Sequence, residues 1–192
     1  MASASKRSTD PRFVRTRQAL RAALLRTLDR FELAQVTVQM IVAEAGIGRA
    51  TFFRHFASVD ALLITVAETM IGDIVQRIGP ALLKGDREAV LELAATYIAE
   101  QRRPIAAILI GGGERTRKEI TDRAIARAAD LPLALDPALP RDLAVAHIVY
   151  SAINVVAWWV TIGKARDDQQ LSTLLRRLSL DPVSASQSPS AS

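Results

Sequence analysis

Apolar residues recur along most of this chain at spacings of three and four positions, which is the period of an α-helix. A first helix is expected to begin near residue 11, because Asp10 can cap it and Pro11 fits the first helical position. Its arginines are expected to stay in water, namely Arg12, Arg15, Arg17, Arg21 and Arg26. The apolar stripe that should face the interior consists of Leu20, Ala23, Leu24, Thr27, Leu28 and Phe31.

Two short helices are expected to follow. Thr37 can cap the first of them, and Gly46 can end it, since glycine adopts a positive φ at no steric cost and suits a sharp turn. The apolar face of this helix consists of Val38, Ile41, Val42 and Ala45. The second helix, from about Gly48 to His55, buries Phe52 and leaves most of its polar residues outside. Two short helices across a tight turn predict a helix-turn-helix, which makes double-stranded DNA the leading partner.

Longer helices fill the rest of the chain. Ser58 starts one that is expected to end at Gly79-Pro80, and the glycine run 111–113 is expected to break the chain later on. Helical periodicity returns over 115–129, and over 86–101 through Val90, Leu93, Ala94, Tyr97 and Ile98. No stretch alternates with a period of two. The sequence therefore predicts an all-α fold with about nine helices.

The segment from Leu143 to Gly163 contains no Asp, Glu, Lys or Arg and is long enough to cross a bilayer. Polar side chains recur mostly along one stripe of it, where lipid would penalise them: His147, Tyr150, Ser151, Asn154 and Thr161. We therefore favour a soluble helix that is buried by its own domain on one face and by a second subunit on the other. The amphipathic segment Asp167–Leu178 would join it in a four-helix dimer interface.

Charge is unevenly distributed along the chain. Residues 1–56 contain ten Lys and Arg against four Asp and Glu, which gives +6, whereas the remaining residues contain 15 against 16, which gives −1. The excess positive charge therefore lies on the segment that carries the predicted helix-turn-helix. A surface that faces phosphates is expected to show this asymmetry, although a solvated basic face would show it too.

Composition places the chain among folded proteins. A hydrophobic content of 49% over 192 residues is ample for a buried core, and the absence of cysteine agrees with a reducing cytoplasm. No secretory signal is visible, so we expect a cytoplasmic protein. The first ten residues are expected to be mobile and residues 183–192 to form a disordered tail. No cofactor and no metal site are predicted.

The run from Thr37 to Leu63, TVQMIVAEAGIGRATFFRHFASVDALL, resembles the DNA-binding module of the TetR (tetracycline-repressor) family of bacterial transcription regulators. The matching positions are Thr37, Val38, Ile41, Ala45, Gly46, Arg49, Thr51, Phe52, His55, Phe56, Ser58 and Leu62. The chain departs from the family pattern at Val42, Gly48, Phe53 and Val59. Phe53 lacks the hydroxyl of the usual tyrosine, and Val59 lacks the charge of the frequent lysine.

This resemblance implies a DNA-binding domain over 1–57 and a helical ligand-binding and dimerisation domain over 58–182. The residues it assigns to DNA are Thr37, Gly48, Arg49, Ala50, Thr51, Phe53, Arg54 and His55. We expect Arg49 to read a guanine through two hydrogen bonds, since the arginine fork matches O6 and N7. Thr37, Thr51, Arg54 and His55 are expected to contact phosphates. Lys6, Arg7, Arg12, Arg15 and Arg17 could extend this footprint or remain solvated.

The resemblance also implies a homodimer that binds a palindromic operator, acts as a repressor and is released by a small-molecule effector. The dimer would form through the last two helices, about 140–163 and 167–178. Candidate residues of the effector pocket combine apolar walls with a few polar groups: Met70, Tyr97, His147, Tyr150, Asn154 and Trp158. For each of them, core packing or the dimer interface is the competing interpretation.

Two other classes of protein are alternatives to a regulator. An enzyme is disfavoured because the chain has two histidines, no cysteine and no nucleophile, phosphate-loop or zinc-protease motif. The second alternative is a helical interaction module of the same fold with weak or lost DNA binding. Phe53 and Val59 favour that alternative, because both positions lack a group that commonly holds phosphate.

Overall fold

The structure is a computed structural model that describes residues 10–162 and 168–184. Over these residues the chain forms nine α-helices and no strand, apart from an isolated bridge between Leu135 and Ser184, so the all-α prediction is confirmed. The elements are α2 (Pro11–Leu28), η1 (Leu33–Gln35), α3 (Val38–Ala45), α4 (Arg49–His55), α5 (Val59–Lys84), α6 (Arg87–Glu100), α7 (Arg102–Ala106), η2 (Ala107–Gly111), α8 (Gly113–Ala129), α9 (Arg141–Ile162), α10 (Asp168–Leu175), η3 (Arg176–Leu180) and η4 (Asp181–Val183).

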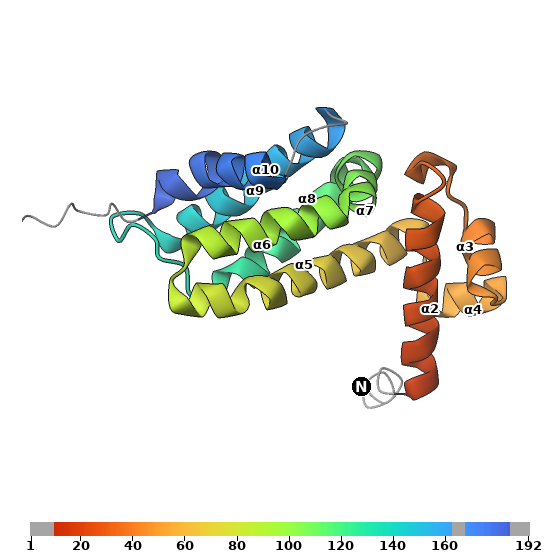
Figure 1. Cartoon of the computed structure of the whole chain (residues 1–192). Helices are drawn as coiled ribbons and strands as arrows, with labels where there is room; N and C mark the ends of the chain where they lie inside the picture. The colour runs from red at the N-terminus through yellow and green to blue at the C-terminus, as the bar shows by residue number, and fades with distance from the viewer. Residues whose placement is uncertain (1–9, 163–167, 185–192) are drawn as a thin grey trace, which may run out of the picture.

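The helices form two groups. Helices α2, α3 and α4 gather at one end of the long helix α5, and α2 lies across its start (Figure 1). We call this group the head. Helices α6 to α10 pack along the rest of α5 as a bundle, which we call the body. Because α5 belongs to both groups, a single continuous helix joins the head to the body.

The predicted helix starts are confirmed. The side chain of Asp10 accepts a hydrogen bond from the backbone N–H of Arg12 at 2.8 Å, and those of Thr37 and Ser58 cap α3 and α5 in the same way. Gly46 ends α3 with a φ of 66°, the left-handed conformation that only glycine adopts without strain. These local signals set the lengths and the crossing of the two short helices.

The core of the head includes the first turns of α5. Leu24, Phe52 and Leu63 are fully buried in one cluster that continues into the body through Met70 and Tyr97. The whole predicted stripe of α2 is buried except for Phe31. Phe31 lies beyond the end of α2 and is exposed, because the chain has already turned away from the helix axis there.

Two features of α5 and α6 differ from the sequence prediction. Helix α5 does not end at Gly79-Pro80 but continues to Lys84, where Gly85 caps it with a φ of 70°. Proline removes one helical hydrogen bond, but Ile78, Ala81 and Leu82 still pack inward, and this packing outweighs the loss. On α6, Leu93 is exposed, and the buried positions are Leu91, Ala95, Tyr97 and Ile98.

Helix α9 is the one helix of the described residues that is long and apolar enough to cross a membrane by length and composition, and one third of its most apolar window is buried. Val183 is buried and Ser184 pairs with Leu135, so the ordered chain extends two residues into the predicted tail. The mobility expected for the first ten residues and for the end of the tail concerns residues outside the described ranges.

We predict that Leu63→Ala lowers the free energy of unfolding by about 2–5 kcal/mol, because it leaves a cavity in the core that α5 shares with the head. Leu83→Ala is the matched control, since Leu83 lies on the same helix with 81% of its surface exposed. Urea unfolding followed by circular dichroism measures both values. Equal effects of the two substitutions would show that α5 does not hold the head in this way.

Candidate nucleic-acid interface

Helix α4 presents most of its side chains to solvent. Arg49, Ala50, Phe53 and Arg54 are exposed, Thr51 is half-buried, and Phe52 faces inward. Gly48 is the N-cap of this helix, with extended backbone and no side-chain cap. The N-terminus of α4 therefore combines small residues with a guanidinium group, which allows the backbone to approach another surface closely.

The exposed side chains of α4 contact one another. The guanidinium carbon of Arg49 lies 5.6 Å from the ring centre of Phe53, and Nη2 of Arg54 donates to Oγ1 of Thr51 at 3.4 Å. Both contacts are weak enough for an anionic partner to replace. Thr37 is also exposed, at the start of α3, while its hydroxyl oxygen accepts the hydrogen bond from the N–H of Met40. The residues of α4 that are predicted to contact DNA are thus accessible to solvent, with one exception.

The exception is His55, which packs inside the head. Its ring lies against Phe13 with the ring centres 4.3 Å apart, and its Nδ1 is buried with no hydrogen-bond partner among the described residues. Burial, followed by the positive charges of Arg17 and Arg54, lowers the pKa of His55. A neutral, half-buried imidazole is a poor phosphate ligand, so the prediction that His55 contacts phosphate is not supported by its position.

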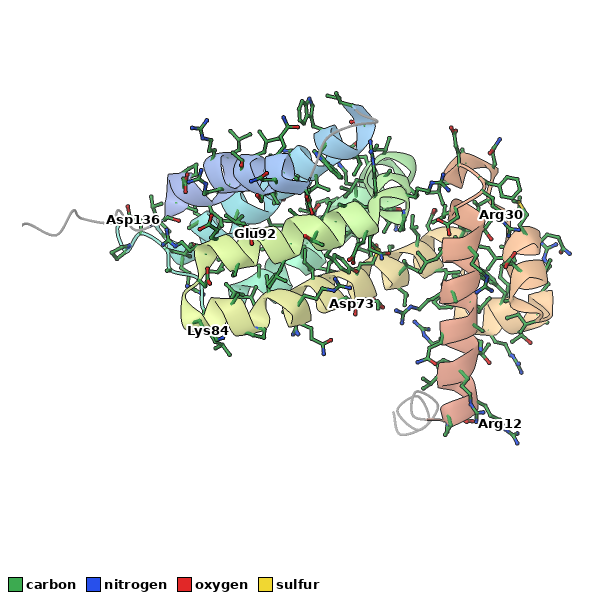
Figure 2. All side chains as sticks on the ribbon, viewed as in Figure 1. Arg12, Arg30, Asp73, Lys84, Glu92 and Asp136 are labelled. Atoms are coloured by element: carbon green, nitrogen blue, oxygen red, sulfur yellow. The ribbon has the colours of Figure 1, made fainter. Side chains whose placement is uncertain are left out.

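Arg17 also has a structural position that the sequence prediction missed. Its guanidinium donates to the carbonyl oxygen of His55 at 3.3 Å and to Oγ1 of Thr65 at 3.4 Å, and it lies 4.4 Å from the ring centre of Phe56. It therefore connects α2 to the end of α4 and to α5. Arg12 and Arg15 are exposed, and Figure 2 shows Arg12 at the N-terminal end of α2. Lys6 and Arg7 lie outside the described residues.

A second arginine contact fixes α3 against α2. Nε of Arg26 lies 2.6 Å from Oε1 of Glu44, and Arg30 contacts the other carboxylate oxygen. The hydrogen bonds from Arg26 and Arg30 lower the pKa of Glu44. No spacing pattern predicts this pairing, because 18 and 14 positions separate the arginines from Glu44. It holds the first helix of the helix-turn-helix in place.

The head touches the body at a second point besides α5. Nη1 of Arg103, on α7, donates to the carbonyl oxygen of Asp29 at the end of α2, at 2.5 Å. Next to it, Gly111 at the end of η2 is so close to η1 that a Cβ on this glycine would lie 2.9 Å from Cβ of Leu33. The α7–η2 segment is therefore packed directly on the head.

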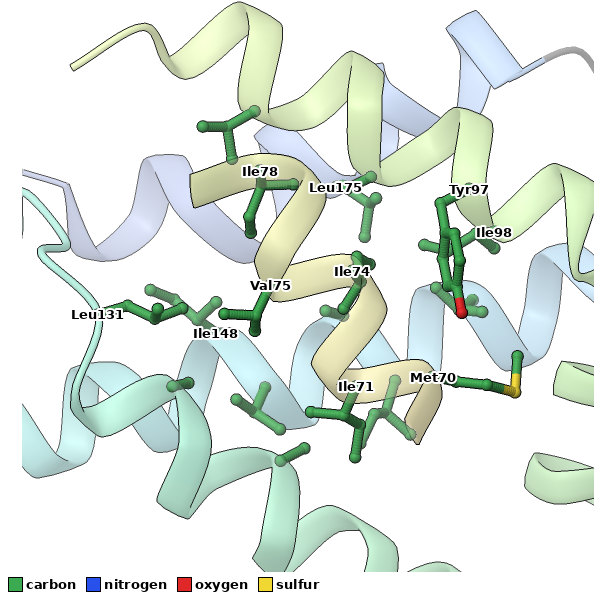
Figure 3. Close-up of a pocket in the computed structure, with 18 of the residues that line it drawn as sticks. Met70, Ile71, Ile74, Val75, Ile78, Tyr97, Ile98, Leu131, Ile148 and Leu175 are labelled. Carbon is green, nitrogen blue, oxygen red and sulfur yellow. The ribbon is translucent and has the colours of Figure 1, made fainter. Parts of the chain in front are cut away.

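The body contains a partly open apolar cavity of about 310 Å³. Residues from α5 to η3 line it, among them Ile74, Ile78, Ile148 and Leu175 (Figure 3). Among the described residues that line it, the hydroxyl of Tyr97 is the one polar side-chain group. Ile105, Ile108 and Leu109 of the α7–η2 segment also form part of its wall, so one segment touches both the cavity and the head.

Two of the six predicted pocket residues, Met70 and Tyr97, line this cavity. The other four do not, which corrects the prediction: His147, Tyr150, Asn154 and Trp158. These four residues lie on the stripe of α9 that carries its polar side chains, and Tyr150, Asn154 and Trp158 are exposed there. The cavity is lined by the opposite face of α9, including Ile148, Val149, Ala152, Ile153 and Val156. Within the described residues no cluster of three or more His, Asp or Glu could hold a metal ion.

These features define a helix-turn-helix head on a helical body that contains a ligand-sized cavity. Comparison with known proteins agrees with this description. A family model for bacterial regulatory proteins of the tetR family matches residues 20–66. An uncharacterized HTH-type transcriptional regulator of Bacillus subtilis, YxbF, is 32% identical over 108 residues, which cover 54% of this chain. The matched stretch spans 28% of the length of that relative. The head of this chain therefore carries a DNA-binding module of the TetR family.

Solved structures share the fold over nearly the whole chain. The fatty acid degradation regulator FadR from Bacillus halodurans has a TM-score of 0.65 at 17% identity, covering 86% of this chain and 95% of its own. FadR from Thermus thermophilus, in complex with lauroyl-CoA, has a TM-score of 0.64 at 13% identity, covering 92% and 99%. At these identities the likeness concerns the fold alone. The proteins matched by sequence and by fold are transcription regulators, which agrees with the expectation of a regulator rather than an enzyme.

The lowered pKa of His55 makes the stability of the head depend on pH. The unfolded chain binds the proton more readily than the folded one, so stability falls as pH drops through the unfolded value of about 6.5. We predict that the melting temperature falls between about pH 7.5 and pH 5.5, and that His55→Phe reduces this fall while keeping the ring contact with Phe13. Scanning calorimetry at both pH values tests this, and an unchanged pH dependence in the variant would exclude His55 as its source.

Proposed function

We propose that this protein is a sequence-specific DNA-binding transcription repressor that binds a palindromic operator as a homodimer and is released by a small-molecule effector. As the DNA it regulates lies in the cytoplasm of a bacterium, the protein acts there. The observation that carries the DNA-binding part is the exposed N-terminal half of α4, where Arg49 projects beside Gly48 and Ala50.

A recognition helix reads bases with its N-terminal residues while neighbouring groups hold phosphates. In α4, Arg49 and Phe53 lie one turn apart on an exposed face, which suits a guanine next to an apolar thymine methyl. Thr51 and Arg54 lie on the same helix and Thr37 is exposed at the start of α3, so these residues would supply hydroxyl and guanidinium donors for phosphates. Phe53 has no hydroxyl to offer, so its contribution would be an apolar contact with the DNA.

The outer face of α9 supports the proposed dimer. Leu143, Tyr150, Trp158 and Ile162 are exposed by 61%, 50%, 41% and 50%. Their spacing places them on one stripe of the helix, and the exposed Asn154 lies within it. Large apolar side chains that share a stripe with polar ones are typical of a protein interface rather than of a lipid-facing surface. A second copy of the chain would cover this stripe on α9.

The cavity supports an effector that acts on the head. Its walls include α5, which carries the head, and the α7–η2 segment, which contacts Asp29 and Leu33. A molecule that fills the cavity can shift the DNA-binding equilibrium only if it binds the two head positions with different affinities. FadR from Thermus thermophilus, a fold neighbour, binds lauroyl-CoA, and the apolar wall of this cavity fits a hydrocarbon group as well.

Selection of bound duplexes from a random pool tests the DNA-binding proposal. We predict enrichment of a palindrome whose half-sites lie a helical turn or more apart, with affinity that falls steeply with salt. Arg49→Ala should weaken operator binding by about 1–3 kcal/mol, roughly five- to 150-fold in Kd, and relax the preference at one base pair of each half-site. Arg127→Ala, an exposed arginine on α8, is the control and should change neither.

The alternative function is a helical interaction module that keeps the fold without reading DNA. It would be favoured if no duplex is enriched at low salt and Arg49→Ala leaves binding to bulk DNA unchanged. Enrichment of a single half-site without symmetry would retain DNA binding but contradict the dimeric operator. Absence of enrichment therefore tests DNA recognition, and absence of symmetry in the enriched site tests dimer formation.

Substitution on the outer stripe of α9 tests the dimer. Tyr150→Arg should convert the dimer to a monomer, because a two-fold interface receives each substitution twice. Operator affinity should then fall by about a hundredfold or more, since the two heads no longer bind together. Light scattering measures the mass and anisotropy measures the affinity. Leu83→Arg, an exposed leucine on α5, is the control, and dimers that persist in Tyr150→Arg would place the interface elsewhere.

A further inference from the structure

A second hollow lies between the head and the body, directly beside the apolar cavity. Its volume is about 520 Å³, and we call it the junction groove. About half of its wall is polar, whereas the cavity is almost wholly apolar, and its residues come from α2 on the head side and mainly from α5 and α6 on the body side. The polar residues that matter here are Gln18 and Arg21 of α2, Asp73 and Arg77 of α5, and Gln101 after α6.

Met70 and Tyr97 line both the groove and the cavity, so these two side chains form the partition between them. Figure 3 shows Met70 and Tyr97 next to each other at one end of the apolar cavity. Methionine is unbranched and flexible, and an aromatic ring turns about two bonds, so this partition can open without movement of the backbone. Burial, followed by the nearby Asp73, raises the pKa of Tyr97 to about 12, so its hydroxyl remains a neutral donor.

Arg21 is the available cation of the groove. Arg77 is paired with Glu100 at 3.0 Å and lies 4.9 Å from the ring centre of Tyr97. Arg21 is half-buried and has no hydrogen bond or ion pair within 4.0 Å among the described residues. Burial lowers its pKa, while the charge of Asp73 opposes this effect. A half-buried guanidinium with free N–H donors is suited to bind a carboxylate or phosphate oxygen.

We propose that the effector site is bipartite and takes an amphipathic anion, with its hydrocarbon chain in the apolar cavity and its anionic head group on Arg21 in the junction groove. The proposal rests on the effector part of the proposed function and names the chemical class of that ligand. The cavity, at about 310 Å³, is large enough to take an alkyl chain of medium length.

This arrangement also explains how the ligand reaches the head. Arg21 belongs to α2 of the head, whereas Met70, Tyr97 and Arg77 belong to the body. One molecule bound across the partition would join the two groups of helices, so its affinity depends on their relative position. By linkage, the ligand and the operator then change each other's affinity by the same factor.

Calorimetric titration of the full chain with four probes tests the proposal: decanoate, 1-decanol, decyltrimethylammonium and acetate. Decanoate should bind most tightly and 1-decanol more weakly. Decyltrimethylammonium and acetate should bind weakest, because decyltrimethylammonium has the wrong charge and acetate lacks the alkyl chain. Arg21→Gln should weaken decanoate by about tenfold, the value of one charge-assisted hydrogen bond, without changing 1-decanol. Arg21→Lys should retain part of the preference for decanoate.

Arg12→Gln is the matched control, since it removes an exposed arginine from the same helix outside the groove. If Arg21→Gln fails to fold, Arg21→Lys tests the same contact, because it keeps the charge and loses the forked donors, so the preference for decanoate over 1-decanol should shrink without disappearing. Equal affinities for decanoate and 1-decanol, an Arg21→Gln variant that binds decanoate normally, or no binding of any alkyl probe would each overturn the proposal. Operator binding without ligand is measured separately, so a failure of DNA recognition leaves the titration result intact and the reverse also holds.

Discussion

Burial of the first turns of α5 inside the head is the interaction on which the rest of the structure depends. Leu62, Leu63 and Val66 pack with Leu24 and Phe52, so the helix-turn-helix has no separate core of its own. This sharing makes the position of the head a property of α5. It also means that any change in the body that tilts or shifts this helix must move α3 and α4, because close-packed interiors transmit displacement rather than absorb it.

The contacts of α7 and η2 with Asp29 and Leu33 are a second attachment of the head to the body, so the head is held at two points. Arg103 and Gly111 hold the end of α2 and η1, while α5 holds the centre of the head. Two π-helical segments occur in the body, and one of them, η2, links the cavity wall to Leu33. π-helical turns are often found at functional sites. In this chain, η2 lies between the wall of the apolar cavity and Leu33 of the head.

Much of the fold was predictable because its signals are local. Asp10, Thr37 and Ser58 cap the helices they precede, and Gly46 makes the turn that its position required. The errors arose where tertiary packing decides. Pro80 fails to end α5 because the surrounding apolar contacts hold the helix. The pocket residues predicted on α9 lie on its polar stripe, whereas the opposite, apolar face of this helix lines the cavity. The contacts Arg103 to Asp29 and Arg26 to Glu44 join residues far apart in sequence, so no spacing pattern indicates them.

The close approach of Gly111 to Leu33 has a mechanical consequence. Helix α2 has 18 residues and is therefore about 27 Å long. Its C-terminal end is pinned beside η2, while its N-terminal end, with Arg12, is free of the body (Figure 2). A small displacement at the C-terminal end of α2, pivoting about its contact with α5, therefore becomes a larger displacement at Arg12. Because Gly111 has no side chain, η2 packs directly on Leu33, and this contact sets the resting position of the head.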